Sequence, residues 1–131
     1  MKVSLRTVKQ FTDVTLPLDE LVVKINAQLG GVEEIIDVHE IYKDALIVRV
    51  VECSKHANAD KLSVCMIDAG QKEFIQVVCG APNVHSDMWA IWLPPKSTVP
   101  ASYNDKQPSV LDAREIRGQM SHGMLAAADE L

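Results

Sequence analysis

The residue types that could do chemistry gather in one short segment, His56-Ala57-Asn58-Ala59-Asp60-Lys61, which lies between two apolar runs. Lysine side chains suit contacts with phosphate, and asparagine and aspartate side chains commonly bond their own backbone in turns. The segment is therefore predicted to be a polar hinge. It either contacts a ligand or forms a turn, and the sequence leaves both interpretations open.

The three cysteines, Cys53, Cys65 and Cys79, are odd in number, lie in apolar runs and have no C-x-x-C spacing. This pattern argues against a disulfide framework and a zinc site, so we expect buried thiols. The chain also lacks P-loop, G-x-S-x-G and H-E-x-x-H signatures. Nothing marks a reactive thiol beside His56. We therefore predict no catalytic residue, no metal ligand and no cofactor in this chain.

Composition places the chain among globular proteins and restricts its partners. It has 131 residues, 47% hydrophobic content and a net charge of -5, from 13 Lys and Arg against 18 Asp and Glu. Proteins that depend on phosphate contacts are usually basic, so tight, sequence-blind binding of nucleic acid is disfavoured. No apolar run approaches the ~20 residues that cross a bilayer, and the start does not resemble a secretory signal. A cytoplasmic location is expected.

The N-terminal part is predicted to form helices. Leu21, Val22, Ile25 and Leu29 have the spacing of one helical face, with Pro17 at a plausible first helical position and two glycines at the end. Ahead of them, a serine at position 4 could cap a short helix. Two short helices cannot enclose a core, so this apolar stripe must dock onto the second part or onto further chain.

From about Ile35 onward the pattern indicates strands without βαβ alternation. Asp68-Ala69-Gly70 is predicted to close a hairpin. The expected fold is mainly β with N-terminal helices, a five-stranded Greek-key barrel of the OB type, with a β-sandwich as the alternative. The predicted strands are 45–53, 61–68, 74–79, 88–93 and 110–117.

Three spaced motifs, in order, resemble a known family. H-A-N-A-D-K-L at 56–62, V-C-G-A-P-N at 78–83 and R-G-Q-M-S-H-G-M-L at 117–125 are similar to the EMAP-type tRNA-binding OB module. That module occurs in free-standing tRNA-binding proteins, in some methionyl-tRNA synthetases and in the bacterial phenylalanyl-tRNA synthetase beta subunit. The start, M-K-V-S-L-R-T-V-K-Q-F, resembles that beta subunit. Departures from the family pattern stand at Thr7, Leu16, Ala57 and Ala126.

The resemblance implies that residues 1–38 are a helical segment of a truncated neighbouring domain and that residues 39–131 are the OB module. The parent enzyme would join phenylalanine to tRNA with ATP and Mg²⁺, as a heterotetramer of two alpha and two beta subunits. This chain would carry none of that active site. Its expected partners are phenylalanine-specific tRNA and the alpha subunit, with no membrane and no DNA. The remaining alternatives are a mainly structural module that packs within the synthetase and a free-standing tRNA-binding protein.

The expected tRNA contacts lie in the hinge, at the exit of the third strand, and in or near residues 117–125, which we call the closing segment. Lys55, Lys61 and Arg117 would contact phosphates. Asn83, Ser121 and Met124 would shape a pocket for a nucleotide. A structural interpretation stays open, in which Ser121 serves a tight reversal and Met124 fills the core. The predicted RNA-binding residues are Lys55, His56, Lys61, Asn83, Arg114, Arg117, Ser121 and Met124.

Aromatic residues for base stacking are few. Trp89 and Trp92 are three positions apart on a predicted strand, so they should point to opposite faces, and one should be outside. The outer tryptophan could stack on a base or cover the docking helices. Phe74 and Tyr42 are the other aromatic side chains expected to be exposed on a binding sheet.

Overall fold

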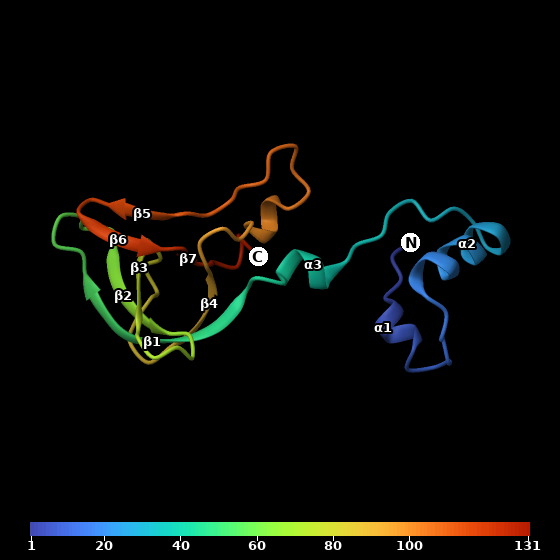
Figure 1. The fold of residues 1–131 in the computed structure, drawn as a ribbon, viewed down its shortest axis with the longest axis horizontal. Coiled ribbons are helices and arrows are strands. Elements are labelled where there is room, and N and C mark those ends of the chain that lie inside the picture. Colours follow the sequence, from blue (N-terminus) through green and yellow to red (C-terminus); the bar gives the residue numbers. More distant parts are fainter. The chain divides into compact units, whose positions relative to one another are not determined.

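The computed structural model describes residues 1–131 and divides them into two compact units, Met1–Asp37 and Val38–Leu131. The first unit is helical and the second is mainly β (Figure 1). None of the helices has both the length and the apolar character needed to cross a membrane.

The first unit contains the two predicted helices. Helix α1 (Leu5–Val8) begins at Ser4, whose hydroxyl accepts a hydrogen bond from the backbone N–H of Thr7 at 3.3 Å, as the sequence predicts. Helix α2 (Leu18–Gln28) follows Pro17, which provides no side-chain cap, and carries two acidic residues in its first turn. The side chains of Leu21, Val22 and Ile25 are half-buried.

The second unit begins with a helix that the sequence analysis missed. Helix α3 (Val38–Tyr42) occupies a stretch predicted to belong to the strand region, and the first strand begins only at Leu46. The five-stranded sheet has the order β3-β2-β1-β4-β7, and all its pairs are antiparallel. Its strands are β1 (Leu46–Lys55), β2 (Ser63–Asp68), β3 (Ile75–Cys79), β4 (Trp89–Leu93) and β7 (Met124–Leu125).

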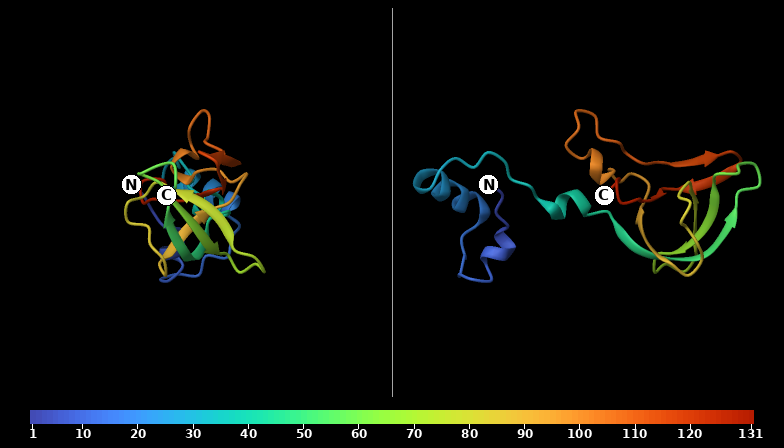
Figure 2. Two further views of the ribbon diagram at one scale, coloured as in Figure 1. Left: turned by 90° about the vertical axis from the view of Figure 1, so that its left-hand side faces the viewer. Right: turned by 180° about the vertical axis from the view of Figure 1, so that it is seen from behind.

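Strand β1 shapes the sheet because it pairs with two neighbours in succession. Its first half, Leu46 to Arg49, pairs with β4, and Arg49 to Lys55 pairs with β2. The register shifts between Val50 and Glu52, where one extra residue forms a bulge. Bulges bend a strand and increase its twist, which lets β1 curve around the barrel, as Figure 2 shows.

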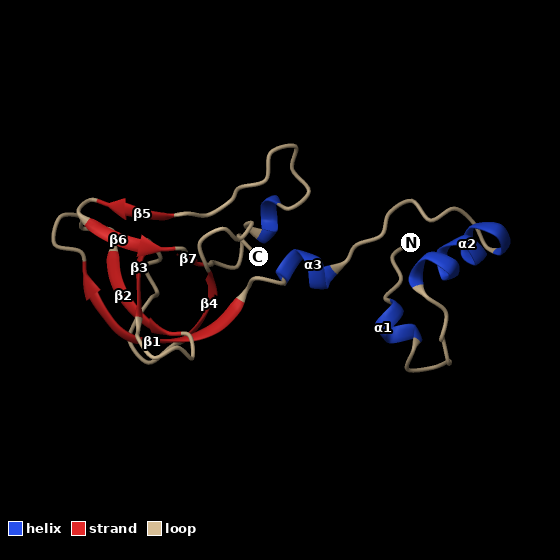
Figure 3. Cartoon of the chain, in the orientation of Figure 1, coloured by secondary structure: helices blue, strands red, loops and turns tan.

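The sequence predicted residues 110–117 as the fifth strand of this sheet, and this assignment was wrong. The chain instead forms a separate hairpin of β5 (Ala113–Ile116) and β6 (Gln119–His122), and β7 supplies the fifth strand beside β4 (Figure 3). The turn explains the difference. Arg117 and Gly118 have φ angles of 50° and 88°, the two positive values that a type I′ hairpin turn requires, so the strand reverses there.

The barrel is completed where β6 lies beside β3, a junction that we call the β3–β6 seam. Side chains make its hydrogen bonds. Gln76 Nε2 donates to the Met120 carbonyl at 2.8 Å, and the Ser121 hydroxyl accepts from the Val78 N–H at 3.0 Å. His122 Nδ1 also lies 3.3 Å from the Gln76 carbonyl oxygen. The nearly closed barrel is an OB-type fold, which confirms the predicted fold class.

A tight backbone approach holds β7 against β4. Gly123 has a φ of +79°, and a methyl group on its Cα would lie 2.1 Å from the Leu93 carbonyl oxygen. Beside it, Trp92 Nε1 donates to the His122 carbonyl at 2.8 Å. Only glycine fits this position, because both the conformation and the space exclude a side chain. The core enclosed by the barrel comprises Val48, Val50, Cys65, Ile67, Val77, Cys79, Trp92 and Leu125.

Candidate nucleic-acid interface

The hinge after β1 is a closed turn centred on a buried histidine. The His56 N–H donates to the Leu62 carbonyl at 2.9 Å, and the Leu62 N–H donates to the Ala59 carbonyl at 3.1 Å. The His56 side chain is only 4% exposed. Its Nδ1 accepts from the Asn58 N–H at 3.0 Å and its Nε2 lies 3.1 Å from the Ile116 carbonyl, so a neutral ring with the proton on Nε2 satisfies both contacts.

His56 therefore joins the hinge to the β5–β6 hairpin. A second contact supports the same junction, since Arg117 Nη1 donates to the Asn58 carbonyl at 3.5 Å. These contacts bring together segments about sixty positions apart in the sequence. The hinge and the hairpin turn therefore form one continuous edge of the barrel (Figure 1).

Four exposed basic side chains lie on or next to this edge, and we call them the basic rim. Lys55 ends β1 directly before the hinge, Lys61 closes the hinge, and Arg114 and Arg117 belong to the hairpin. None of them forms an ion pair with a carboxylate. Their charges are thus available to a polyanion, although Asp60 and Glu115 lie nearby in sequence and reduce the local positive potential.

The other predicted site residues have different surroundings. Ser121 is 1% exposed, and its hydroxyl bridges the Val78 N–H and the Gly123 carbonyl, which it contacts at 3.1 Å. Met124 is half-buried and pairs with a residue of β4. Asn83 is exposed and lines a cavity that neither Ser121 nor Met124 lines.

The tryptophan prediction is confirmed, because Trp89 is 69% exposed and Trp92 is 4% exposed. Phe74 is also exposed, just before β3. The expectation that Tyr42 lies on a sheet was wrong. Tyr42 belongs to α3, and its hydroxyl donates to the carbonyl of Leu131.

The cysteine thiols are packed in the barrel rather than presented to a substrate. Cys65 and Cys79 are buried and Cys53 is half-buried, and all three are free. The sulfur atoms of Cys53 and Cys65 are 3.7 Å apart. Burial, assisted by the contact with Cys53, raises the pKa of Cys65 to about 12, and burial also raises the pKa of Cys79. Thiols held neutral in this way are poor nucleophiles.

Residues 46–131 match the family described as "Putative tRNA binding domain". The chain belongs to this family. It is 36% identical to the phenylalanine–tRNA ligase beta subunit of Nitrobacter winogradskyi and 37% identical to that of Rhodopseudomonas palustris. Both alignments include the whole of this chain and 16% of the relative, so the chain spans about a sixth of the length of these proteins.

Solved structures support the fold of this tRNA-binding family member. An RNA ligase from Naegleria gruberi superimposes with a TM-score of 0.53 at 18% identity. The alignment covers 67% of this chain and 29% of the ligase. At this level of identity the likeness shows a shared fold.

Sequence reasoning on this tRNA-binding domain missed two features of the site. It placed His56 among the RNA contacts, whereas the ring is buried and bonded on both nitrogens. It also missed Gln76, which spans the β3–β6 seam. No local signal identifies either role, since the His56 Nε2 contact with the Ile116 carbonyl and the Gln76 contact with the Met120 carbonyl join residues more than forty positions apart.

Proposed function

We propose that this chain binds tRNA through the basic rim. The junction of the hinge and the β5–β6 turn supports this proposal most directly, because it brings Lys55, Lys61 and Arg117 to one edge of the barrel. OB folds commonly bind nucleic acid with a sheet face and its flanking loops. Within this proposal, Lys55, Lys61, Arg114 and Arg117 contact phosphates.

The remaining predicted residues take supporting roles in this proposal. His56 holds the hinge against the hairpin, and Ser121 and Met124 hold the closing segment in place. Asn83 is the polar side chain offered to RNA on the neighbouring loop. An acidic chain with four such basic side chains should bind tRNA weakly, and its affinity should depend strongly on salt.

We extend the proposal to the larger enzyme on the basis of the relatives. As part of a cytoplasmic phenylalanine–tRNA ligase, the module would help to dock phenylalanine-specific tRNA beside an alpha subunit. Residues 1–38 would then belong to a neighbouring domain. ATP and Mg²⁺ would serve the ligase reaction elsewhere in that enzyme, and no residue of this chain is assigned to the reaction.

A titration of labelled tRNA at two salt concentrations tests the proposal. Lys55→Ala, Lys61→Ala and Arg117→Ala should each weaken binding and reduce the slope of log K against log salt by about one. Lys106→Ala is the matched control, because this lysine is also exposed but lies in the loop after the 3-10 helix η1 (Pro100–Ser102). No binding at low salt, or equal losses in the control, would contradict the proposal.

A structural role is the second candidate, and one observation favours it. Ile47 and Trp89 are 76% and 69% exposed on adjacent strands, where Ile47 pairs with Ile91 and Arg49 pairs with Trp89. Alternating side chains of paired strands share a face, so these apolar groups lie together on the outside of the barrel. Such a face suits packing against protein. Absence of tRNA binding at low salt would favour this role.

A further inference from the structure

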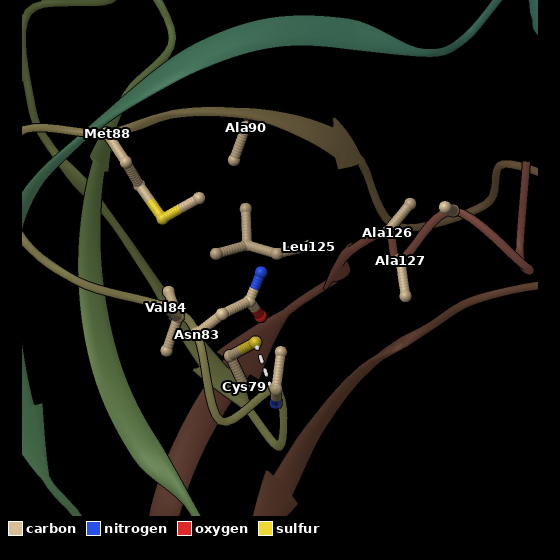
Figure 4. A pocket seen from close by; sticks show the side chains of 10 residues that line it. Cys79, Asn83, Val84, Met88, Ala90, Leu125, Ala126 and Ala127 are labelled. Carbon is tan, nitrogen blue, oxygen red and sulfur yellow. Dashed lines mark hydrogen bonds between the residues drawn. The ribbon is translucent and has the colours of Figure 1, made fainter.

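The cavity that Asn83 lines lies near the hinge. Its volume is about 180 Å³, and it lies between the end of β3, the loop after it and the segment that follows β7. Figure 4 shows Cys79, Val84, Met88 and Leu125 around it, with the Asn83 amide directed toward its middle. Alanines 81, 90 and 126–128 complete the lining, and their small side chains leave the space open.

The size of the cavity limits what it can hold. A cavity of about 150 Å³ lined by apolar side chains can bind benzene, whereas sites for drug-sized ligands and cofactors occupy roughly 300–1,000 Å³. A space of about 180 Å³ therefore suits one flat ring system. A complete nucleotide or a cofactor is too large for it.

The lining also selects the chemistry of the ring. The Asn83 amide offers two donors and an acceptor, which match the hydrogen-bonding edge of a nucleobase. The thioether of Met88 and the side chain of Leu125 provide apolar contact for a ring face.

The carboxylate of Glu130 lies near the cavity and disfavours an anion there. Glu130 is bound by the Ala127 N–H at 2.7 Å, and its carboxylate adds weakly to the effect of burial in raising the pKa of Cys79. A phosphate would be repelled by this carboxylate, but a neutral base would not.

The cavity borders the basic rim. Gly80 precedes the lining residue Ala81, and a methyl group on Gly80 would lie 3.6 Å from Leu62 Cδ2. Leu62 directly follows Lys61, a member of the rim. The loop that carries Asn83 is therefore packed against the hinge that carries a proposed phosphate contact.

We propose that this cavity binds one unpaired base of the tRNA whose backbone lies on the basic rim. Asn83 recognises the edge of the base, and the apolar lining covers its faces. This inference rests on the proposed function. It assigns base contact to the loop after β3, whereas the closing residues Ser121 and Met124 serve the barrel.

Two variants of the full chain test the assignment by different means. Ala127→Leu fills the cavity from an exposed position, and Asn83→Asp replaces the amide by a carboxylate of the same shape. The control Asn104→Asp makes the same charge change at an exposed residue outside the cavity. Thermal unfolding of each variant shows whether it is folded. If Ala127→Leu does not fold, Asn83→Asp alone carries the test.

Binding of a tRNA transcript is measured with chemical probing of each unpaired base. Wild type should protect one base, and both variants should expose it again. Ala127→Leu should weaken affinity roughly five- to 150-fold, the range for losing one stacked base. Asn83→Asp should also weaken affinity, because it removes the amide donors that contact the edge of the base. The salt slope should stay unchanged. Equal affinity and protection in wild type and both variants would overturn the base site while leaving the proposed function intact. Absence of binding by wild type would overturn both.

Discussion

The two sides of the barrel are held together in different ways. Between β1 and β2, six register pairs run from Arg49 and Asp68 to Lys55 and Ser63. Across the β3–β6 seam, the bonds come from the side chains of Gln76, Ser121 and His122. A backbone ladder tolerates many substitutions because every residue supplies the same groups, whereas the seam depends on particular side chains. The closing segment, 117–125, therefore has a structural role in the barrel that does not depend on RNA binding.

The largest expected effect comes from Gly123, where the seam meets β7. Gly123→Ala places a methyl group against the Leu93 carbonyl in a left-handed backbone, so we expect a loss of more than about 4 kcal/mol in the free energy of unfolding. Gly118→Ala is the control, because its φ is also positive but its surroundings are open. It should cost only about 1–2 kcal/mol. Urea denaturation measures both, and equal costs would contradict the steric argument.

On the β1–β2 side, Cys65 should make the free energy of unfolding depend on pH in the alkaline range. Its folded pKa of about 12 is above the ordinary value of 9.0, so the unfolded chain releases this proton first. The stability contributed below pH 9 should be lost as the pH rises from 9 toward 12. Cys65→Ala should make this loss shallower, and Cys79 leaves a residual loss of the same sign. Urea midpoints from pH 7 to 11 measure it, and parallel curves for the two proteins would refute the assignment.

A smaller loss is expected when one side chain of the seam is removed. Ser121→Ala deprives the Val78 N–H of its acceptor, which should cost about 1–3 kcal/mol in the free energy of unfolding. Ser54→Ala removes the same hydroxyl from an exposed position on β1 and should change stability by less than about 0.5 kcal/mol. If the two substitutions cost the same, the seam does not depend on Ser121.

The smallest expected effect is a difference in amide hydrogen exchange within the unaltered chain. The Val50 N–H of β1 donates to a backbone group, the Met88 carbonyl just before β4, at 2.9 Å, and Val50 is fully buried. This amide should exchange only through global unfolding. The Val78 N–H should exchange at a lower opening free energy, because a side chain is its acceptor. Equal protection factors at these two amides would contradict the distinction between backbone-bonded and side-chain-bonded contacts.

The sequence identified elements whose cause is local. The cap at Ser4, the glycine turn between β2 and β3 and the opposite facing of Trp89 and Trp92 depend on spacing of a few residues, and they were predicted. The reversal at Arg117 was missed because a non-glycine residue adopts a left-handed conformation there.

Features of the candidate site that depend on long-range packing could not be predicted from the sequence. The exposure of the basic residues could be predicted from their type, because charged side chains are rarely buried. The burial of His56 and the hollow around Asn83 depend on chain segments distant in sequence, so local patterns could not show them.

Arg117 occupies a left-handed backbone position and, in the proposed function, contacts tRNA. Asparagine or glycine would occupy its left-handed position with less backbone strain, at a difference of about 1 kcal/mol. Neither would put a guanidinium beside the hinge. A version of this domain improved only for thermal endurance would therefore be expected to discard this residue, and with it one of the few cations that an acidic protein can offer to RNA.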